Sequence, residues 1–221
     1  MKTAYPSTFC FHMGKKRTPS SKRWIAEHEA DTYVHEARRL GYRSRAVFKL
    51  KELNERDRLL KPGMLVVDLG AAPGGWSQLA RPLLGPKGRL VALDILPVEP
   101  ISGVEIIVGD FRDEAVLHRL QALAPPAGVD LVMSDIAPNI SGIDAADQAA
   151  SVYLAELALE FAKERLKPGG NFLTKLFQGE GFDEYVRQLR SCFDTVQIRK
   201  PKASRPRSRE VYLLARNYQV L

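Results

Sequence analysis

The stretch MLVVDLGAAPGGWSQ, residues 64–78, decides the fold of this chain. It opens with apolar residues, reaches an acid at Asp68, and then turns through the run GAAPGG. A continuous apolar run that ends in a glycine turn is typical of a buried parallel strand, and it predicts that a helix begins near Trp76. Glycine suits this turn because it adopts positive φ and lets a ligand approach the backbone closely.

The order of the glycines favours S-adenosylmethionine over a nucleotide phosphate as the ligand of this turn. A dinucleotide site requires G-x-G-x-x-G and a P-loop requires G-x-x-x-x-G-K-[ST], and the turn has neither pattern. A glycine-rich turn directly after the strand-terminal Asp68 suits a ligand that carries an ammonium group and an adenosine, as S-adenosylmethionine does. A βα turn that binds no ligand remains the alternative at this point.

Length, charge and cysteine content limit the class of protein. The 221 residues suffice for one well-packed α/β domain, and the net charge of +7 favours a polyanionic partner. No apolar run approaches the roughly 20 residues of a membrane span, and the start lacks the apolar segment of a signal peptide. Cys10 and Cys192 lie far apart without partners at metal-ligand spacing. We therefore expect a reduced, cytoplasmic protein that holds no metal and contacts no membrane.

The first residues differ in composition from the rest of the chain. Residues 1–26 contain no acid and carry six lysines and arginines among Pro, Ser and Gly. We interpret residues 1–26 as a basic arm that contacts phosphates, and residues 27–221 as a single domain. A solvated tail without a partner is the alternative for the arm.

Strands and helices alternate along the rest of the chain. Further strands are expected at about 89–95, 104–110, 129–135, 171–177, 195–199 and 210–215, and further helices at about 24–41, 46–60, 149–166 and 182–192. Ser44 is expected to cap the N-terminus of the helix that follows it. Pro168-Gly169-Gly170 is expected to end the helix predicted at about 149–166. This alternation predicts a mostly parallel seven-stranded sheet with helices on both faces and an antiparallel last hairpin.

Carboxylates recur where the expected strands end. Asp94, Asp110 and Asp135 each end a strand, as Asp68 does. In a parallel sheet the carboxyl ends of the strands form one edge, which is where ligands bind. Asp94 lies 24 residues after Gly70. This is close to the separation at which an acid after a glycine turn binds the ribose hydroxyls of a ligand. One such acid would mean little, because Asp is common in turns.

Two lysines occur in apolar contexts, Lys49 within FKL and Lys175 within TKLF. A lysine in the position of Lys49 usually extends its ammonium group to solvent. In this topology, however, Asp135 and Lys175 lie on neighbouring strands and can flank a methyl donor. Methyl transfer to a ribose hydroxyl needs a positioned base, since the hydroxyl is a poor acid. A lysine can serve where a second cation and partial burial lower its pKa, and carboxylates such as Glu210 hold the ammonium groups.

Other methyl acceptors fit less well. Enzymes that methylate an exocyclic amine usually carry [DNS]-P-P-aromatic after the fourth strand, and this chain has D-I-A-P-N there. Methylation at C5 of a pyrimidine needs a cysteine nucleophile, and neither Cys10 nor Cys192 lies at a strand end near the donor turn.

The segments SRAVFKL, VVDLGAAPGGWSQ, VMSDIAPN, KLFQGEGFDEY and RSREVY resemble the FtsJ/RlmE family, and the resemblance covers about residues 14–218. It implies a Rossmann-like class I S-adenosylmethionine-dependent methyltransferase that acts on a ribose 2'-oxygen of ribosomal RNA. The family's K-D-K-E catalytic set falls on Lys49, Asp135, Lys175 and Glu210, with Lys175 as the proton acceptor. Residues 1–12 depart from the family pattern, which usually lacks this extension.

The resemblance and the turn together imply a set of donor-binding residues and a substrate. The donor-binding residues are expected to be Asp68, Gly70, Gly74, Trp76, Asp94, Asp110 and Asp135. The implied substrate is a uridine in the A-loop of 23S rRNA within the assembled large (50S) subunit, and we expect the enzyme to be a monomer. Methylation of tRNA or of an mRNA cap, and ribosome assembly without catalysis, are the alternatives.

Basic residues before the first strand and before Glu210 are expected to form one RNA-facing surface. They are Lys15, Lys16, Arg17, Lys22, Arg23, Arg43, Arg45, Arg199, Lys202, Arg205 and Arg207. RNA would be recognised by its shape and its 2'-hydroxyls, with the target nucleotide turned out of its stack.

Overall fold

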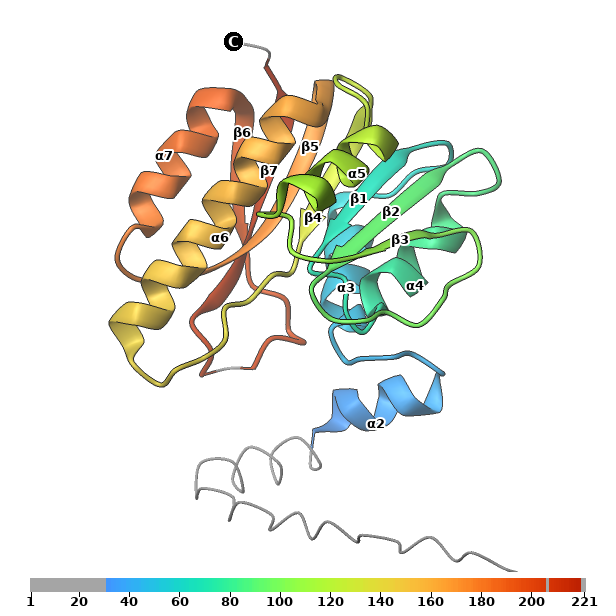
Figure 1. Ribbon diagram of the computed structural model, residues 1–221. Helices are drawn as coiled ribbons and strands as arrows, with labels where there is room; N and C mark the ends of the chain where they lie inside the picture. Colours follow the sequence, from blue (N-terminus) through green and yellow to red (C-terminus); the bar gives the residue numbers. More distant parts are fainter. Residues whose placement is uncertain (1–30, 206, 220–221) are drawn as a thin grey trace, which may run out of the picture.

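A computed structural model describes residues 31–205 and 207–219, and Figure 1 shows how their helices and strands are arranged. The expected basic arm, residues 1–26, lies outside the described residues. So do five of the predicted RNA contacts, namely Lys15, Lys16, Arg17, Lys22 and Arg23.

The centre of the fold is a seven-stranded sheet with the order β3-β2-β1-β4-β5-β7-β6. The strands are β1 (Leu65–Leu69), β2 (Arg89–Asp94), β3 (Glu105–Val108), β4 (Val129–Ser134), β5 (Leu166–Phe177), β6 (Phe193–Arg199) and β7 (Glu210–Tyr218). The pairs among β1 to β5 are parallel, whereas β7 is antiparallel to both β5 and β6. The predicted mostly parallel sheet with an antiparallel last hairpin is therefore confirmed.

Helices cover both faces of this sheet, as expected (Figure 1). The helices are α2 (Thr32–Arg39), α3 (Val47–Asp57), α4 (Gly75–Leu83), α5 (Glu114–Leu123), α6 (Asp144–Arg165) and α7 (Phe182–Cys192). One apolar cluster joins the sheet to α5, α6 and α7, and a second joins it to α3 and α4. Because both faces are covered, the central strands are apolar on both sides rather than alternating.

Strand β1 and its turn form as the opening stretch predicts. Val66, Val67 and Leu69 have no exposed surface, which is what a strand buried on both faces requires. Gly70 then adopts φ +77°, and a Cβ there would lie 2.7 Å from the side chain of Ile136. The turn thus abuts the chain that leaves β4, and only glycine fits it.

One prediction about a helix end is wrong, and the fifth strand begins earlier than expected. The N-cap of α3 is Ala46 without a side-chain hydrogen bond, not Ser44. Ser44 packs instead against the start of α4, where a Cβ on Gly75 would approach its hydroxyl to 2.5 Å. Helix α6 ends at Arg165, and the Pro168-Gly169-Gly170 run forms part of β5, opposite a register irregularity in β4.

Within residues 31–205 and 207–219, no helix is both long and apolar enough to cross a bilayer.

Candidate active site

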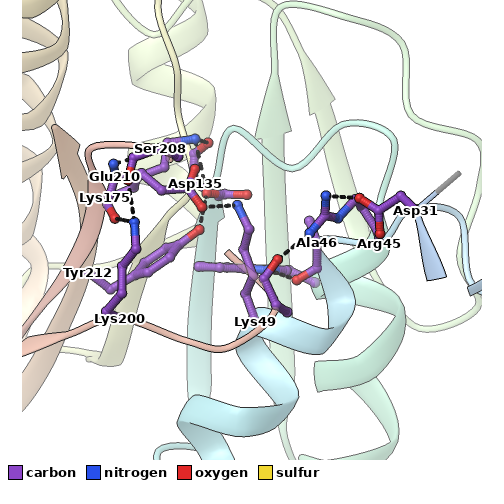
Figure 2. Close-up of polar contacts among 12 residues, drawn as sticks. Asp31, Arg45, Ala46, Lys49, Asp135, Lys175, Lys200, Ser208, Glu210 and Tyr212 are labelled. Carbon is purple, nitrogen blue, oxygen red and sulfur yellow. Dashed lines mark hydrogen bonds and ion pairs between the residues drawn. The ribbon is translucent and has the colours of Figure 1, made fainter. Parts of the chain in front are cut away.

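The four residues Lys49, Asp135, Lys175 and Glu210 converge at the carboxyl edge of the sheet (Figure 2). They come from α3, the end of β4, β5 and the start of β7. The ammonium nitrogen of Lys49 lies 2.7 Å from Glu210 Oε1, and that of Lys175 lies 3.0 Å from Asp135 Oδ1. The strand order accounts for this convergence, because β4 pairs with β5 and β5 pairs with β7.

The pleat of the β5–β7 pair sets which side chains face the site. Lys175 lies opposite Tyr212, and Phe177 lies opposite Glu210. Opposed residues on paired strands share a face, and so do residues two apart on one strand. Lys175, Phe177, Glu210 and Tyr212 therefore line one face, and α3 brings Lys49 to the same side.

The charges at the site are buried and paired. Lys175 is only 8% exposed, and it also donates to the backbone oxygen of Asp135 at 2.7 Å. Burial alone would raise the pKa of Asp135, but the charges of Lys175 and Lys49 outweigh it and hold that pKa below its usual value. Burial, the largest single effect, would also raise the pKa of Glu210, but the charge and hydrogen bond of Lys49, with smaller contributions from Ser204 and Lys175, together lower it. Both carboxylates are therefore ionised at neutral pH and hold the two lysines in place.

Tyr212 is a component of the site that the sequence reasoning missed. Its hydroxyl donates to Asp135 Oδ1 at 2.7 Å, and its ring centroid lies 5.7 Å from the ammonium nitrogen of Lys49. Burial raises the pKa of Tyr212 well above its usual value, so the hydroxyl keeps its proton and can donate. The spacing to Glu210 was the available signal, since residues two apart on a strand share a face.

Lys200 was missed as well. Its ammonium group donates to the backbone oxygens of Ser208 and Glu210 at 2.6 and 2.5 Å (Figure 2). Lys200 thus ties the chain that enters β7 to the end of β6. Burial, as the largest effect, lowers the pKa of Lys200.

A cavity of about 570 Å³ opens at the carboxyl ends of β1, β2 and β4. Four of the predicted donor-binding residues line it, namely Gly70, Asp94, Asp110 and Asp135. The carboxylate of Asp94 accepts hydrogen bonds from the amides of Ala72 and Leu96, each at 2.8 Å. The cavity combines acids with apolar walls and has the usual size of a small-molecule site, so it fits S-adenosylmethionine.

Three other predicted donor-binding residues lie behind this cavity. Asp68 has no exposed surface, and it accepts a hydrogen bond from the Ser77 hydroxyl at 2.6 Å. Gly74 adopts φ +107°, and a Cβ there would lie 2.8 Å from the guanidinium of Arg43. Trp76 donates through Nε1 to the backbone oxygen of Ala46 and packs against Tyr212. None of these three residues is among those that line the cavity, and a direct contact with the donor stays a prediction for them.

A second cavity, of about 450 Å³, borders the Lys49–Glu210 pair. Lys49 and Glu210 form part of its wall, whereas Asp135 faces the first cavity. The remaining lining residues are Arg45, Ala46, Phe177, Arg205, Arg207 and Ser208. Asp135 of one ion pair therefore lines the cavity that contains Asp94 and Asp110, and the other pair, Lys49–Glu210, lines a cavity rich in arginines. We call these the donor cavity and the second cavity.

The predicted RNA contacts within the described residues fall into two groups. Arg45, Arg205 and Arg207 line the second cavity, and Lys202 is exposed nearby in sequence. Arg199 instead forms two hydrogen bonds to Asp57, at 2.8 and 2.9 Å.

The guanidinium of Arg43 donates to three backbone oxygens, those of Pro73, Glu99 and Pro100. It thereby fastens the chain beyond β2 to the glycine turn. Arg43 and Arg199 both have partners within the fold, and the RNA contacts expected of these two residues stay predictions.

The part of the chain that the structure describes has no group of three His, Cys, Asp or Glu side chains placed to hold a metal ion.

Known proteins resemble the chain over most of its length. A family model for FtsJ-like methyltransferases matches residues 42–218. The chain is 58% identical to the ribosomal RNA large subunit methyltransferase E of Marinobacter nauticus, over 92% of this chain and 99% of that protein. It is 59% identical to the protein of the same name from Xanthomonas oryzae pv. oryzae, over 92% of this chain and 97% of that one.

Solved structures share the fold. A protein from Plasmodium falciparum described as a ribosomal RNA methyltransferase superposes with a TM-score of 0.71 and 28% identity, over 80% of this chain and 98% of that one. Aeropyrum pernix fibrillarin, crystallised with S-adenosylmethionine, superposes with a TM-score of 0.54 and 17% identity, over 77% of this chain and 73% of that one. The latter likeness concerns the fold alone.

Proposed function

Because the chain belongs to the FtsJ-like methyltransferase family, we propose that it transfers a methyl group from S-adenosylmethionine to a ribose 2'-oxygen of large-subunit ribosomal RNA. More specifically, we propose that the target is a uridine in the A-loop of 23S rRNA within the assembled large subunit. The names of the relatives and the net charge of +7 support an RNA substrate. We expect the activity in the cytoplasm, where ribosomal subunits occur.

One observation carries the proposal: of two neighbouring lysine–carboxylate pairs, one lines the second cavity through Lys49 and Glu210, and the other lines the donor cavity through Asp135. A methyl transfer joins two reactants that approach from opposite sides, and catalytic groups must lie where they meet. Asp135 faces one cavity, while Lys49 and Glu210 face the other. This is the arrangement that transfer from one cavity into the other requires.

The residues divide the chemical work between them. S-adenosylmethionine, when bound, supplies a methyl group that a nucleophile can attack. Lys175 is the base in this proposal, and it must be unprotonated to take the proton of the 2'-hydroxyl. Asp135 holds the Lys175 nitrogen with both a side-chain and a backbone oxygen. Lys49 supplies a cation near the reacting oxygen, and Glu210 holds it there.

The donor cavity supplies the groups that would hold the methyl donor. Asp94 and Asp110 offer acceptors for hydroxyl groups, and Asp135 offers a negative charge for an ammonium group. Ile95 and Leu96 add apolar surface beside Asp94. These residue types match the polar and apolar parts of S-adenosylmethionine.

The test is transfer of labelled methyl groups to purified large subunits from cells that lack this enzyme. Free rRNA, tRNA and capped mRNA are assayed in parallel. We expect label on one ribose of the large-subunit RNA, and loss of label with Lys175→Ala. Lys163→Ala, which removes a lysine of α6 outside the site, is the matched control and should keep full activity.

Three results would contradict parts of the proposal. Label on tRNA or cap alone would leave the chemistry and overturn the substrate. Binding of subunits by the wild type without any transfer would indicate an assembly factor. Full transfer by Lys175→Ala would remove Lys175 from the role of base.

A further inference from the structure

Phe177 is the aromatic side chain among the described residues that line the second cavity. It ends β5 and is half-buried. It lies two residues beyond Lys175 on the same face of the sheet, directly opposite Glu210. The ring therefore borders the catalytic cluster itself rather than the outer surface of the molecule.

The backbone around Phe177 is held on two sides. The Phe177 oxygen accepts a hydrogen bond from the side-chain amide of Gln148 on α6 at 3.0 Å, and the same amide donates to the Glu180 oxygen at 2.9 Å. The pairing of β5 with β7 fixes the other side. A ring carried on such a backbone is preorganised, which reduces the entropy lost when a ligand packs on it.

Cations surround the rest of this cavity. Arg45, Arg205 and Arg207 line it together with Lys49. Arg45 is itself held by an ion pair with Asp31 and a hydrogen bond to the Ala203 oxygen, so its charge has a fixed position. An aromatic face beside several cations is complementary to a nucleotide, which has a flat base and negative phosphates.

The position of the cavity selects one nucleotide of the RNA. In the proposed reaction the 2'-hydroxyl of a ribose must reach Lys49 and Lys175; Lys49 lines the second cavity, and Lys175 binds Asp135, which lines the donor cavity. Enzymes that do chemistry on a stacked base turn its nucleotide out into a pocket, and we extend this mode of access to the target ribose. The extruded base then needs a new stacking partner, because it has left its neighbours in the RNA.

We propose that the second cavity takes the extruded target nucleotide, with its base stacked on Phe177 and the neighbouring phosphates held by Arg45, Arg205 and Arg207. This inference rests on the proposed 2'-O-methylation of large-subunit rRNA, and it deepens that proposal by naming the base platform. Phe177 touches the substrate in this proposal but takes no part in the proton transfer.

The test compares methyl transfer to large subunits by Phe177→Leu and Phe177→Tyr. Leucine keeps apolar bulk but removes the ring, so kcat/KM for subunits should fall by roughly 5- to 150-fold, the range measured for loss of one base–aromatic stack. Tyrosine keeps the ring and should retain most of the wild-type value. Ile198→Ala, which removes an exposed apolar side chain of β6, is the control and should not change transfer. Affinity for S-adenosylmethionine, measured by calorimetry, should be the same in all four proteins.

The possible results separate this inference from the proposed function. No transfer by the wild type overturns both. Normal transfer by the wild type together with normal transfer by Phe177→Leu overturns the platform alone. If Phe177→Leu fails to bind the donor, wild-type enzyme is cross-linked to subunits by ultraviolet light. A cross-link from the methylated nucleotide to the peptide that contains Phe177 supports the platform, and cross-links confined to other peptides overturn it.

Discussion

Asp68 is a carboxylate inside the sheet with no exposed surface. Its Oδ2 accepts a hydrogen bond from Ser77, whereas Oδ1 has no hydrogen-bond partner among the described residues. Burial, as the largest effect, raises the pKa of Asp68 to about 7, and the nearby charges of Asp135 and Asp94 act in the same direction. An unpaired buried charge is costly, so the neutral form is favoured in the folded protein.

We predict that Asp68→Asn stabilises the protein at pH 8. The folded-state pKa lies above the unfolded value, so between about pH 4 and 7 the folded chain keeps a proton that the unfolded chain has released. Stability therefore falls as pH rises through this window. A shift of about three units at about 1.4 kcal/mol each sets an upper limit of roughly 4 kcal/mol on the gain. Urea unfolding at pH 8 and pH 4 measures it, and a gain that is equal at both pH values would contradict the assignment.

Asp135 and Glu210 have different sets of partners, and their roles should differ accordingly. Asp135 holds Lys175, accepts from Tyr212 and faces the donor cavity, whereas the side chain of Glu210 pairs with Lys49.

We expect Asp135→Asn to slow methyl transfer by about 100-fold or more, in the range of a disrupted acid–base arrangement. Glu210→Gln should slow it less, because the base keeps its own partner. Single-turnover rates at saturating donor concentration measure both variants. If Glu210→Gln slows methyl transfer more than Asp135→Asn does, the prediction is wrong. The Lys49–Glu210 pair would then matter more for the rate than the Lys175–Asp135 pair.

At the scale of elements, Asp57 joins α3 to the last two strands. It ends α3, accepts two hydrogen bonds from Arg199 of β6, and lies 3.7 Å from Arg216 of β7. The hydrogen bonds from Arg199 lower the pKa of Asp57 and outweigh the opposite effect of its partial burial. This cluster fixes the helix that carries Lys49 against the hairpin that carries Glu210.

We predict that Asp57→Asn lowers the free energy of unfolding at pH 7 by about 1.5–3 kcal/mol, the usual value of hydrogen bonds to a charged group. A carboxyl group with a lowered folded-state pKa stabilises above its unfolded pKa, and this contribution is lost as pH falls below about 4. The difference between wild type and variant should therefore shrink at pH 3. Glu184→Gln, which breaks the exposed pair with Arg187, is the control and should change stability little.

The strands and most helices could be predicted because their signals are local. The apolar run of β1 and the periodic pattern of α7, which runs from Phe182 to Cys192 as expected, each reflect one buried face. The ends of elements depend on contacts that the sequence does not reveal. Ser44 has the chemistry of a cap, but its hydroxyl packs on Gly75 of another helix. The Pro168-Gly169-Gly170 run has the chemistry of a stop, but it lies within β5, in the irregular segment between Leu166 and Asn171, which both pair with β4.

The acids at the site could be predicted once the strands were known, because the carboxyl ends of parallel strands lie at one edge of the sheet. Spacing alone could place Tyr212 on the face of Glu210 and Phe177 on the face of Lys175, but it could not bring these two faces together, because that depends on the register in which β7 pairs with β5. Charge alone did not separate Arg205 and Arg207, which line the second cavity, from Arg199, which holds α3. Distinguishing them requires knowing where the acids lie.

At the scale of the whole molecule, positive charge is expected to determine how strongly RNA is held. The chain carries a net charge of +7, and residues 1–26 contribute six cations without an acid. Residues 1–26 and the second cavity would then bind the same RNA. The arm would bind phosphates away from the target nucleotide, and the second cavity would bind the target nucleotide itself.

We predict that replacing Lys15, Lys16, Arg17, Lys22 and Arg23 by glutamine weakens subunit binding and flattens its salt dependence. For every phosphate that the variant no longer neutralises, the slope of log K against log salt should decrease in magnitude by about 0.7–0.9. Donor affinity should not change. Binding measured at several salt concentrations provides the test, against a control in which five exposed cations elsewhere are neutralised, namely Lys61, Lys87, Arg119, Lys167 and Arg190. An unchanged slope in the arm variant would remove the arm from the interface.

The place of β7 in the sheet determines when the site can exist during synthesis of the protein. This strand lies between β5 and β6 although it follows both in the sequence, and it carries Glu210 and Tyr212. A nascent chain that has been translated only as far as β6 therefore lacks the partner of Lys49 and the hydroxyl that binds Asp135. A chain that has not been translated beyond residue 210 is therefore expected to transfer no methyl group. The same holds for a product truncated by a premature stop codon before that residue.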